Sequence, residues 1–199
     1  MNTHTPRIQV ILGSTRQGRA GEQVARWFAD LAGQRDDIVA ELVDLRDWPL
    51  PFFDFPTSPK RELSDDPRVR AWSAKVTEAD GYVLVTPEYN YGYPAVLKNA
   101  LDHLYYEWND KPVGFVGYGG MAGGIRAVQQ LRQVVVELGL IQTHAQVIIP
   151  RVFSAFDDAG QPVDAFHPKM ATSMLDEIAE WATLLHAKRD AKTLAAATA

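Results

Sequence analysis

The stretch with the most evident chemical character is the turn at 86–94, which holds three tyrosines, an asparagine and a glutamate. An apolar run at 82–85 precedes it, and a helical pattern begins at residue 95. In open parallel sheets, ligands bind beyond the carboxyl ends of the strands. Prolines near both ends of the turn fix φ, so part of its shape is set in advance. The turn therefore predicts a site for a flat heteroaromatic ligand, to which Asn90 can donate and accept hydrogen bonds.

Some side chains of this turn have a second explanation. The rings of Tyr89 and Tyr91 can offer faces and edges to a ligand. Tyr93 is equally well explained by packing in the core or at a subunit contact. Glu88 is a possible acid or base, but the sequence shows no partner for that chemistry. We expect Glu88 to be structural and to accept backbone hydrogen bonds in the turn.

The turn at 13–19 has the features of a phosphate site. Gly13 allows a tight turn, and the following helix offers free N–H groups and the positive end of its dipole. The turn also supplies two hydroxyl donors and two cations: Ser14, Thr15, Arg16 and Arg19. An ordinary helix N-cap with surface arginines is the alternative, and the two arginines in one turn favour phosphate. The spacing lacks both G-x-G-x-x-G and the P-loop lysine, which predicts a single terminal phosphate.

A third turn, at 118–124, contains four glycines, two of them Gly119 and Gly120. Glycine lets a ligand approach the backbone closely. The alternative is a plain connection from strand to helix, for which one glycine would suffice. Because strand ends of one polarity share one edge of a parallel sheet, the three turns should converge. A phosphate, a planar polar ring and a glycine wall together describe flavin mononucleotide (FMN).

The elements that position these turns alternate along the chain. Apolar runs predict five strands, at 7–12, 39–45, 81–85, 111–117 and 142–149. Helical periodicity predicts helices at about 21–32, 69–79, 95–106, 125–138 and 166–187, the last with a buried stripe of Met170, Met174, Ile178, Trp181 and Leu185. This order predicts an α/β, flavodoxin-like fold, with a five-stranded parallel sheet and helices on both faces.

The length favours one domain, which we place at 1–188. The mixed-charge and alanine-rich segment at 189–199 is expected to be a disordered tail without a packed role. The proline-rich segment at 46–66 is too apolar for a free linker and is expected on the domain surface or on a partner subunit. No cysteine is present, the net charge is −5, the N-terminus is polar and no apolar run reaches membrane length. These features predict a cytoplasmic protein without a nucleic-acid or membrane surface.

Other chemistries lack their residues. There is no G-x-S-x-G elbow for a serine hydrolase. The histidines are scattered and show no metal-ligand spacing, so no metal site is predicted and they are treated as structural or surface residues. This assignment is least secure for His103, which is on the helix after the ring-binding turn. Asp44 ends a strand and is expected to be a cap.

Four segments, Gly13-Ser14-Thr15-Arg16, Thr86-Pro87-Glu88-Tyr89-Asn90, Pro94-Ala95-Val96-Leu97-Lys98-Asn99-Ala100-Leu101-Asp102 and Gly117-Tyr118-Gly119-Gly120, carry a family resemblance. Over roughly residues 7–185 the chain resembles the NAD(P)H-dependent FMN reductases, a flavodoxin-like family that includes quinone, chromate and azo reductases. The resemblance implies FMN held non-covalently in a homodimer, often paired into a tetramer. It also implies NADPH or NADH as co-substrate.

The resemblance also implies roles for individual residues. Ser14, Arg16 and the turn that follows correspond to the phosphate grip. The isoalloxazine platform corresponds to Pro87, Glu88, Tyr89 and Asn90, and the third flavin loop contains Gly119 and Gly120. Many members carry serine and asparagine where this chain has Arg19 and Gly21, and we expect Arg19 to replace that contribution. Tyr91-Gly92-Tyr93 in place of small residues suggests a more aromatic pocket.

The expected activity is that of an FMN-dependent oxidoreductase, which passes hydride from NAD(P)H to a quinone, a free flavin or a similar acceptor by ping-pong turnover. No catalytic side chain is expected, because the flavin carries the chemistry. The alternatives are a flavodoxin-like electron carrier and a non-catalytic flavin-binding redox sensor. Aromatic residues at 104–108 exceed what one helix face buries and predict the dimer contact, which the proline-rich segment could join.

Overall fold

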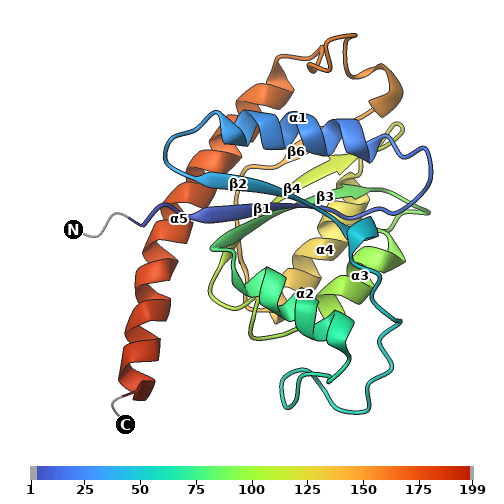
Figure 1. The fold of residues 1–199 in the computed structure, drawn as a ribbon. Helices are drawn as coiled ribbons and strands as arrows, with labels where there is room; N and C mark the ends of the chain where they lie inside the picture. Colours follow the sequence, from blue (N-terminus) through green and yellow to red (C-terminus); the bar gives the residue numbers. More distant parts are fainter. Residues whose placement is uncertain (1–3, 198–199) are drawn as a thin grey trace.

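A computed structural model describes residues 4–197, with the side chains of residues 4–191. A parallel sheet forms the middle layer (Figure 1). Its strands are β1 (Arg7–Leu12), β2 (Val39–Asp44), β3 (Gly81–Pro87), β4 (Pro112–Tyr118), β5 (Ile141–Gln142) and β6 (Val147–Ile149). The strand order is β2-β1-β3-β4-β5, and β6 also pairs with β4. This is the flavodoxin-like order, so the predicted fold class is confirmed.

The predicted fifth strand is divided in two. β5 pairs with the start of β4 and β6 with its end, so the two pieces follow each other along one edge. Between them, the backbone amides of His144 and Ala145 donate to the Glu177 carboxylate, at 2.6 and 2.9 Å. A helix side chain thus replaces the missing ladder partners.

Helices cover both faces of the sheet (Figure 1). On one face lie α1 (Gly21–Gly33) and α5 (Phe166–Ala197), and on the other lie α2 (Pro67–Thr77), α3 (Ala95–Asp102) and α4 (Ile125–Glu137). Every residue of β3 and β4 is buried, as expected for central strands covered on both faces. Two short 3-10 helices, η1 (Leu45–Asp47) and η2 (Val152–Ser154), follow β2 and β6. Within residues 4–197, no helix has both the length and the apolar character needed to cross a membrane.

The proline-rich segment is tied to its own domain. The carbonyl of Pro51 accepts hydrogen bonds from the Asn99 side chain and from His103 Nε2, at 2.7 and 2.8 Å. The Trp48 ring lies 5.2 Å from that of Trp72. The segment therefore lies on the surface of its own domain, which was one of the two expected arrangements. His103 has a structural role in holding this segment.

The aromatic residues after α3 pack differently from the expectation. α3 ends at Asp102 and does not continue to 106. Trp108 is buried beside Trp72 and Tyr82, and its indole N–H donates to the Leu101 carbonyl at 3.3 Å. The prediction that the aromatic residues at 104–108 are more than the domain itself can bury is therefore wrong for Trp108.

The last helix also differs from the prediction in two respects. Trp181 is 40% exposed, because Ala182 occupies the inward position between Ile178 and Leu185. The helix continues to Ala197, where a disordered tail from residue 189 was expected, and Arg189 donates to Asp80 and to the Asp110 carbonyl. Residues 198–199 of that tail lie outside the described residues.

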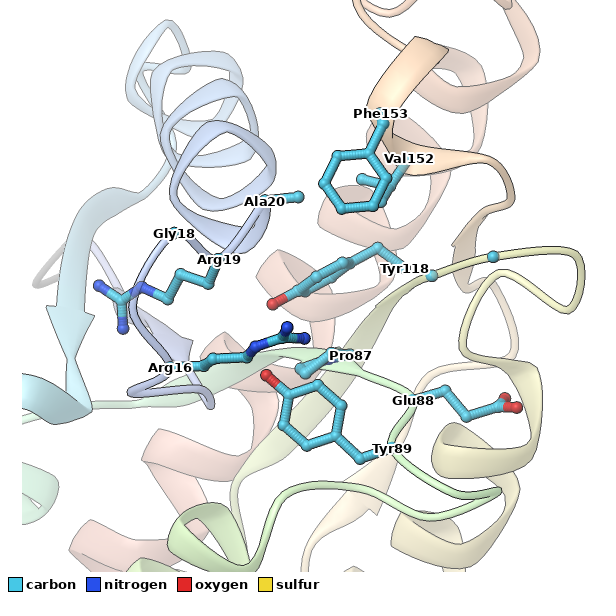
Figure 2. Close-up of a pocket in the computed structure, with 12 residues that line it drawn as sticks. Arg16, Gly18, Arg19, Ala20, Pro87, Glu88, Tyr89, Tyr118, Val152 and Phe153 are labelled. Atoms are coloured by element: carbon cyan, nitrogen blue, oxygen red, sulfur yellow. The ribbon is translucent and has the colours of Figure 1, made fainter.

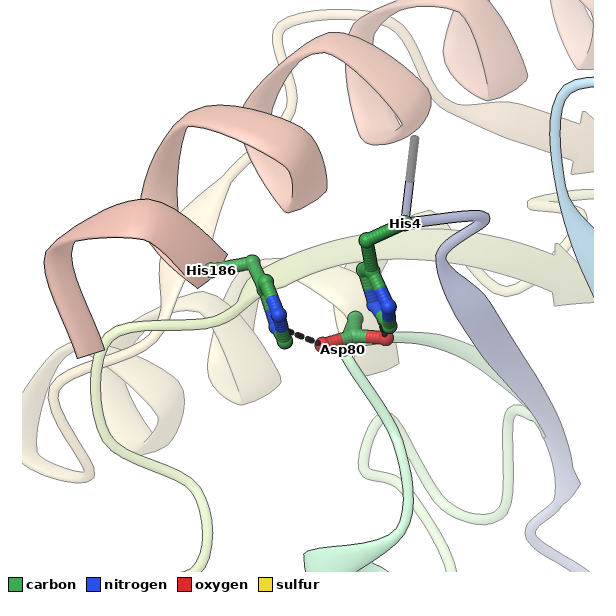
Figure 3. Close-up of side chains that lie close together, drawn as sticks. All are labelled: His4, Asp80 and His186. Atoms are coloured by element: carbon green, nitrogen blue, oxygen red, sulfur yellow. Dashed lines mark hydrogen bonds and ion pairs between the residues drawn. The ribbon is translucent and has the colours of Figure 1, made fainter. Parts of the chain in front are cut away.

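A polar cluster lies at the amino end of the sheet, where Asp80 precedes β3 (Figure 3). Its carboxylate binds His4 Nε2 at 2.7 Å, His186 Nδ1 at 3.0 Å, the Arg189 guanidinium at 2.5 Å and the Arg7 amide at 3.0 Å. By distance alone His4, Asp80 and His186 could hold a metal ion. The two imidazoles are stacked 3.7 Å apart and nearly parallel, however, so their in-plane lone pairs do not converge. The cluster is better described as an ionic clamp between the two ends of the chain, a grouping that the scattered histidines did not predict.

Candidate functional site

A pocket at the carboxyl end of the sheet brings the three predicted turns together (Figure 2). Twelve residues line it: Arg16, Gly18, Arg19, Ala20, Pro87, Glu88, Tyr89, Tyr118, Gly119, Gly120, Val152 and Phe153. The first four come from the turn before α1, the next three from the end of β3 and the following turn, and three from the end of β4 onward. Val152 and Phe153 belong to η2, which the sequence reasoning missed. Since η2 follows β6, the same strand-end rule could have found it.

The first turn is joined to the second through a serine. Ser14 is buried, and its hydroxyl shares a hydrogen bond of 2.7 Å with the Tyr89 hydroxyl. It also accepts from the Arg16 amide at 3.4 Å. Thr15 is exposed and does not line the pocket. The side chain of Arg16 extends across the pocket toward Tyr118 (Figure 2).

Arg19 has a different role from Arg16. Its side chain is only 1% exposed, and its guanidinium pairs with Asp44 and Glu22 and donates to the Ser14 carbonyl. Burial acts to lower its pKa, but Asp44 and Glu22 outweigh this and raise it. Figure 2 shows the guanidinium extending away from the pocket. The expectation that Arg19 grips a phosphate loses its basis, because the cation is already committed within the protein.

Asp44 is the counterpart of this arginine. It pairs with Arg19 and also caps η1 by accepting from the Arg46 amide at 2.9 Å. Burial alone would raise the pKa of Asp44, whereas the Arg19 and Arg46 contacts lower it overall. The prediction of a capping role is confirmed.

The second turn reverses the chain tightly between Tyr89 and Gly92. These two residues exchange backbone hydrogen bonds of 2.8 and 2.9 Å, and the two residues between them, Asn90 and Tyr91, have φ of 50° and 70°. Positive φ at both central positions is the geometry of a type I′ turn, which asparagine tolerates better than tyrosine. Asn90 faces a hollow that adjoins the main pocket. Tyr93 packs against the core, as its alternative explanation proposed.

Glu88 is structural, as predicted, although its partner lies on helix α4 and not in the same turn. Its carboxylate accepts from the Arg126 amide at 3.1 Å and pairs with the Arg126 guanidinium, which stacks 3.7 Å from the centre of the Tyr91 ring. Arg126 is in the first turn of α4. The pair therefore fixes the second turn against the start of α4, directly after the third turn, and no sequence pattern indicated it.

The third turn is fixed to η2 and leaves an open wall. The carbonyls of Gly119 and Gly120 accept from the Val152 and Arg151 amides, at 3.0 and 2.8 Å. A Cβ on Gly120 would meet no atom within 4 Å, so this backbone is accessible from the pocket side. At Gly124, which has φ of 87°, a Cβ would lie 2.6 Å from the Tyr118 amide. The close packing at Gly124 requires glycine, and the open space at Gly120 leaves room for a ligand against the backbone.

Tyr118 completes the pocket beside the start of α1, and sequence reasoning did not assign it a role. The side chain is buried, yet its hydroxyl has no hydrogen-bond partner among the described residues. Gly21, the first residue of α1, does not line the pocket. A Cβ there would lie 2.1 Å from the Tyr118 hydroxyl, so Gly21 makes room for the ring. The N-cap residue, Ala20, gives α1 no side-chain cap.

The pocket residues fit an FMN molecule at both of its ends. The uncapped N-terminus of α1, the Arg16 cation and the unpartnered Tyr118 hydroxyl suit a phosphate. Pro87, Tyr89 and the accessible glycine backbone suit a flat ring. The fit to FMN does not depend on one side chain. It rests on hydrogen-bond donors at one end of the pocket and on accessible backbone at the other.

Comparison with known proteins gives a consistent result. Residues 6–154 match the family described as NADPH-dependent FMN reductase. An NAD(P)H-dependent FMN reductase of Schizosaccharomyces pombe is 43% identical over 151 residues, which cover 74% of this chain and 75% of that protein. A 2-hydroxy-1,4-benzoquinone reductase of a Burkholderia species is 32% identical over 188 residues, covering 88% and 95%.

The same fold is found in a solved flavoenzyme. The structure of FerB, an NAD(P)H:(acceptor) oxidoreductase from Paracoccus denitrificans, superposes with a TM-score of 0.71 at 23% identity. It covers 89% of this chain and 97% of the FerB chain.

Proposed function

Since this chain belongs to the NADPH-dependent FMN reductase family, we propose that the pocket between its three turns binds FMN and presents it to NAD(P)H and then to a quinone or free flavin. The chain is an oxidoreductase, and the acceptor is the proposed part. The observation that carries the proposal is the convergence of an uncapped helix N-terminus and an accessible glycine backbone on one pocket.

The phosphate end of the ligand is assigned to the start of α1. Gly18, Arg19 and Ala20, which lead into α1, border the pocket, and Arg16 is the lining arginine whose side chain extends into it. Helix N-termini favour anions through their N–H groups and the helix dipole. We assign the charge contact to Arg16 and leave Arg19 as the brace that holds this turn to β2.

The ring end is assigned to the second and third turns. Pro87 and Tyr89 form one wall, and Gly119 and Gly120 form the other. Asn90 borders the adjoining hollow, where it can reach the polar edge of a ring. The Glu88–Arg126 pair holds both turns in place without entering the chemistry itself.

Bound FMN would supply the redox chemistry, the passage of a hydride equivalent from NAD(P)H to the acceptor. The protein contributes the shape of the open face. Glu88 is the one carboxylate that lines the pocket among the described residues, and it is committed to Arg126. No lining side chain is therefore available as a strong acid or base, which agrees with a role limited to binding and orientation.

The open side of the pocket suits an aromatic acceptor. Phe153 of η2 stands at its edge and is 92% exposed, while Val152 is buried behind it. Nicotinamide and quinone are both flat, so each can occupy the same face in turn. This arrangement predicts ping-pong turnover, with the donor leaving before the acceptor arrives.

We also propose a homodimer, in which exposed aromatic residues face a second copy. Phe52, Tyr91 and Tyr106 are strongly exposed for large apolar rings. Pairing of dimers into a tetramer and a cytoplasmic location stay predictions. Light scattering coupled to gel filtration tests the assembly, and a strict monomer would contradict it.

The activity is tested by steady-state NADPH oxidation with a benzoquinone and, separately, with free FMN as acceptor. Parallel double-reciprocal lines are expected for ping-pong turnover. A flavin-loaded protein that NADPH does not bleach under anaerobic conditions would instead support the electron-carrier or sensor alternatives. A protein that binds no flavin would contradict all three.

A further inference from the structure

The Tyr118 hydroxyl is a buried polar group for which the fold provides no partner. Tyr118 is 3% exposed, ends β4 and lines the pocket. The Tyr118 hydroxyl lacks a hydrogen-bond partner within the described part of the chain. Leaving a buried hydroxyl unsatisfied costs stability. A native fold retains such a group where something else satisfies it, and its place in the pocket points to a ligand.

The position of this hydroxyl indicates which part of the ligand it meets. It lies against Gly21, the first residue of α1, and Figure 2 shows the ring directed toward the turn that precedes this helix. That is the phosphate end of the pocket. A phenol O–H can donate one hydrogen bond to a phosphate oxygen.

Arg16 aside, the other side-chain donors at this end have partners within the protein. The Ser14 and Tyr89 hydroxyls share one hydrogen bond, and the Arg19 guanidinium is paired with Asp44. Ala20 contributes no side-chain donor. Tyr118 is therefore the neutral side-chain donor at this end of the pocket that makes no hydrogen bond to any described residue.

Gly21 and Tyr118 depend on each other. An added Cβ at Gly21 would lie 2.1 Å from the tyrosine oxygen and 2.7 Å from its ring carbon Cζ. Any larger residue at 21 would force the hydroxyl away from the helix start. Because Gly21 has no side chain, the Tyr118 hydroxyl of β4 can occupy the space beside the start of α1.

Burial keeps this phenol in its donor form. Burial is the largest influence on Tyr118 and raises its pKa, and Tyr89 adds to this, whereas Arg19 and Ser14 act in the opposite direction. The net direction is upward, so the O–H remains protonated at any pH at which the protein works.

We propose that the Tyr118 hydroxyl donates a hydrogen bond to the terminal phosphate of FMN and thereby selects FMN over riboflavin. This inference rests on the proposed function and names a determinant of its cofactor specificity. Riboflavin has the same ring without the phosphate, so the hydroxyl gains nothing from it.

The test is Tyr118→Phe, with FMN and riboflavin titrated separately against apoprotein by quenching of flavin fluorescence. Hydrogen bonds to charged groups contribute about 1.5–3 kcal/mol, which corresponds to roughly a 10- to 100-fold loss of FMN affinity. Riboflavin affinity should stay within about twofold, because packing is conserved. Tyr106→Phe, an exposed tyrosine outside the pocket, is the matched control and should change neither affinity.

Several outcomes would overturn the inference. If Tyr118→Phe leaves FMN affinity unchanged, the hydroxyl makes no contact with phosphate. If both flavins lose affinity equally, Tyr118 only packs. A phosphorus NMR shift of bound FMN that is identical in wild type and Tyr118→Phe would overturn it independently of affinity. Failure of the wild-type protein to bind FMN would overturn the proposed function itself, which separates the two claims.

Discussion

The two ends of the same sheet are built in opposite ways. At the amino end, Asp80 gathers four donors, and Lys111 contacts the Tyr82 hydroxyl and the Val76 carbonyl, at 3.0 and 3.2 Å. At the carboxyl end, the start of α1 has no side-chain cap and the buried hydroxyl of Tyr118 has no partner within the described chain.

This difference separates stability from binding. Polar groups that satisfy one another hold the chain ends together but leave nothing to offer a ligand. Polar groups that the fold leaves unsatisfied cost stability until a ligand arrives. Changes at the amino end should therefore reduce stability without altering flavin selection, and changes to the pocket groups that the fold leaves unsatisfied at the carboxyl end should do the reverse.

The largest effect is expected at the amino end. Asp80→Ala leaves Arg189 and two histidines without their shared carboxylate. Because these partners are partly exposed, we expect the lower end of the about 3–5 kcal/mol that removing one partner of a fully buried pair costs. Urea unfolding should show this loss, whereas FMN affinity of the folded variant should stay within twofold. Lys188→Ala, which disturbs an exposed pair beside the clamp, is the control and should cost below about 1 kcal/mol.

The same residue predicts an acid limb in the stability profile. Burial acts to raise the pKa of Asp80, but the Arg7 amide and the His4 and His186 contacts outweigh it, so its pKa is lowered from 3.8. A lowered pKa stabilises the fold above 3.8, and this stabilisation is lost as the pH falls below that value. An acid titration in which Asp80→Asn unfolds with the same pH profile as wild type would contradict this assignment.

A second test contrasts the two arginines of the first turn. Arg19→Ala strands Asp44 and the Ser14 carbonyl, and we expect it to lower the free energy of unfolding by about 2–3 kcal/mol, less than a fully buried pair because Asp44 is partly exposed. FMN and riboflavin affinities should fall together, if they fall at all. A loss confined to FMN would restore Arg19 as a phosphate ligand.

Lys111 predicts a pH dependence of the same sign as that of Asp80, but in a higher pH range. Burial lowers its pKa from 10.5 to about 7. Between these values the unfolded chain binds the proton and the folded chain does not, so stability rises as pH increases. From pH 7 to 9 the wild-type protein should gain about 1–2 kcal/mol, and Lys111→Met should lose this slope. Equal slopes in urea melts at both pH values would contradict the assignment.

The smallest stability effect, with a clear effect on binding, is expected for Arg16→Ala. Arg16 is exposed and its side chain enters the pocket, so its loss should leave the urea midpoint unchanged. FMN affinity should fall about 10-fold or more, as expected for a charge-assisted hydrogen bond, while riboflavin affinity stays constant. Unchanged FMN affinity would remove Arg16 from the phosphate site.

The fold and the convergence of the three turns on one pocket were predictable because they depend on local patterns. Alternating apolar runs and helical periodicity are set by nearby residues, and the strand-end rule then brings turns far apart in sequence to one edge. The family of the chain was predictable from the Pro87-Glu88-Tyr89-Asn90 segment and the helix after it.

Pairings between distant side chains were not predictable. Arg19 was expected to face a phosphate, but Asp44 lies on the neighbouring strand and takes its charge. The Glu88–Arg126 pair and the clamp around Asp80 are likewise set by the three-dimensional arrangement. The role of Tyr118 was missed because it depends on two facts that only the structure shows. The hydroxyl lies against Gly21, and it has no hydrogen-bond partner among the described residues.

The central claim is that the carboxyl end of the sheet binds FMN through its phosphate. Its most direct test is a titration of the apoprotein with FMN and riboflavin under identical conditions, followed by anaerobic addition of NADPH. We expect FMN to bind at least 10-fold more tightly than riboflavin and the bound flavin to be bleached by NADPH. Equal affinity for the two flavins, or no binding of either, would contradict the account.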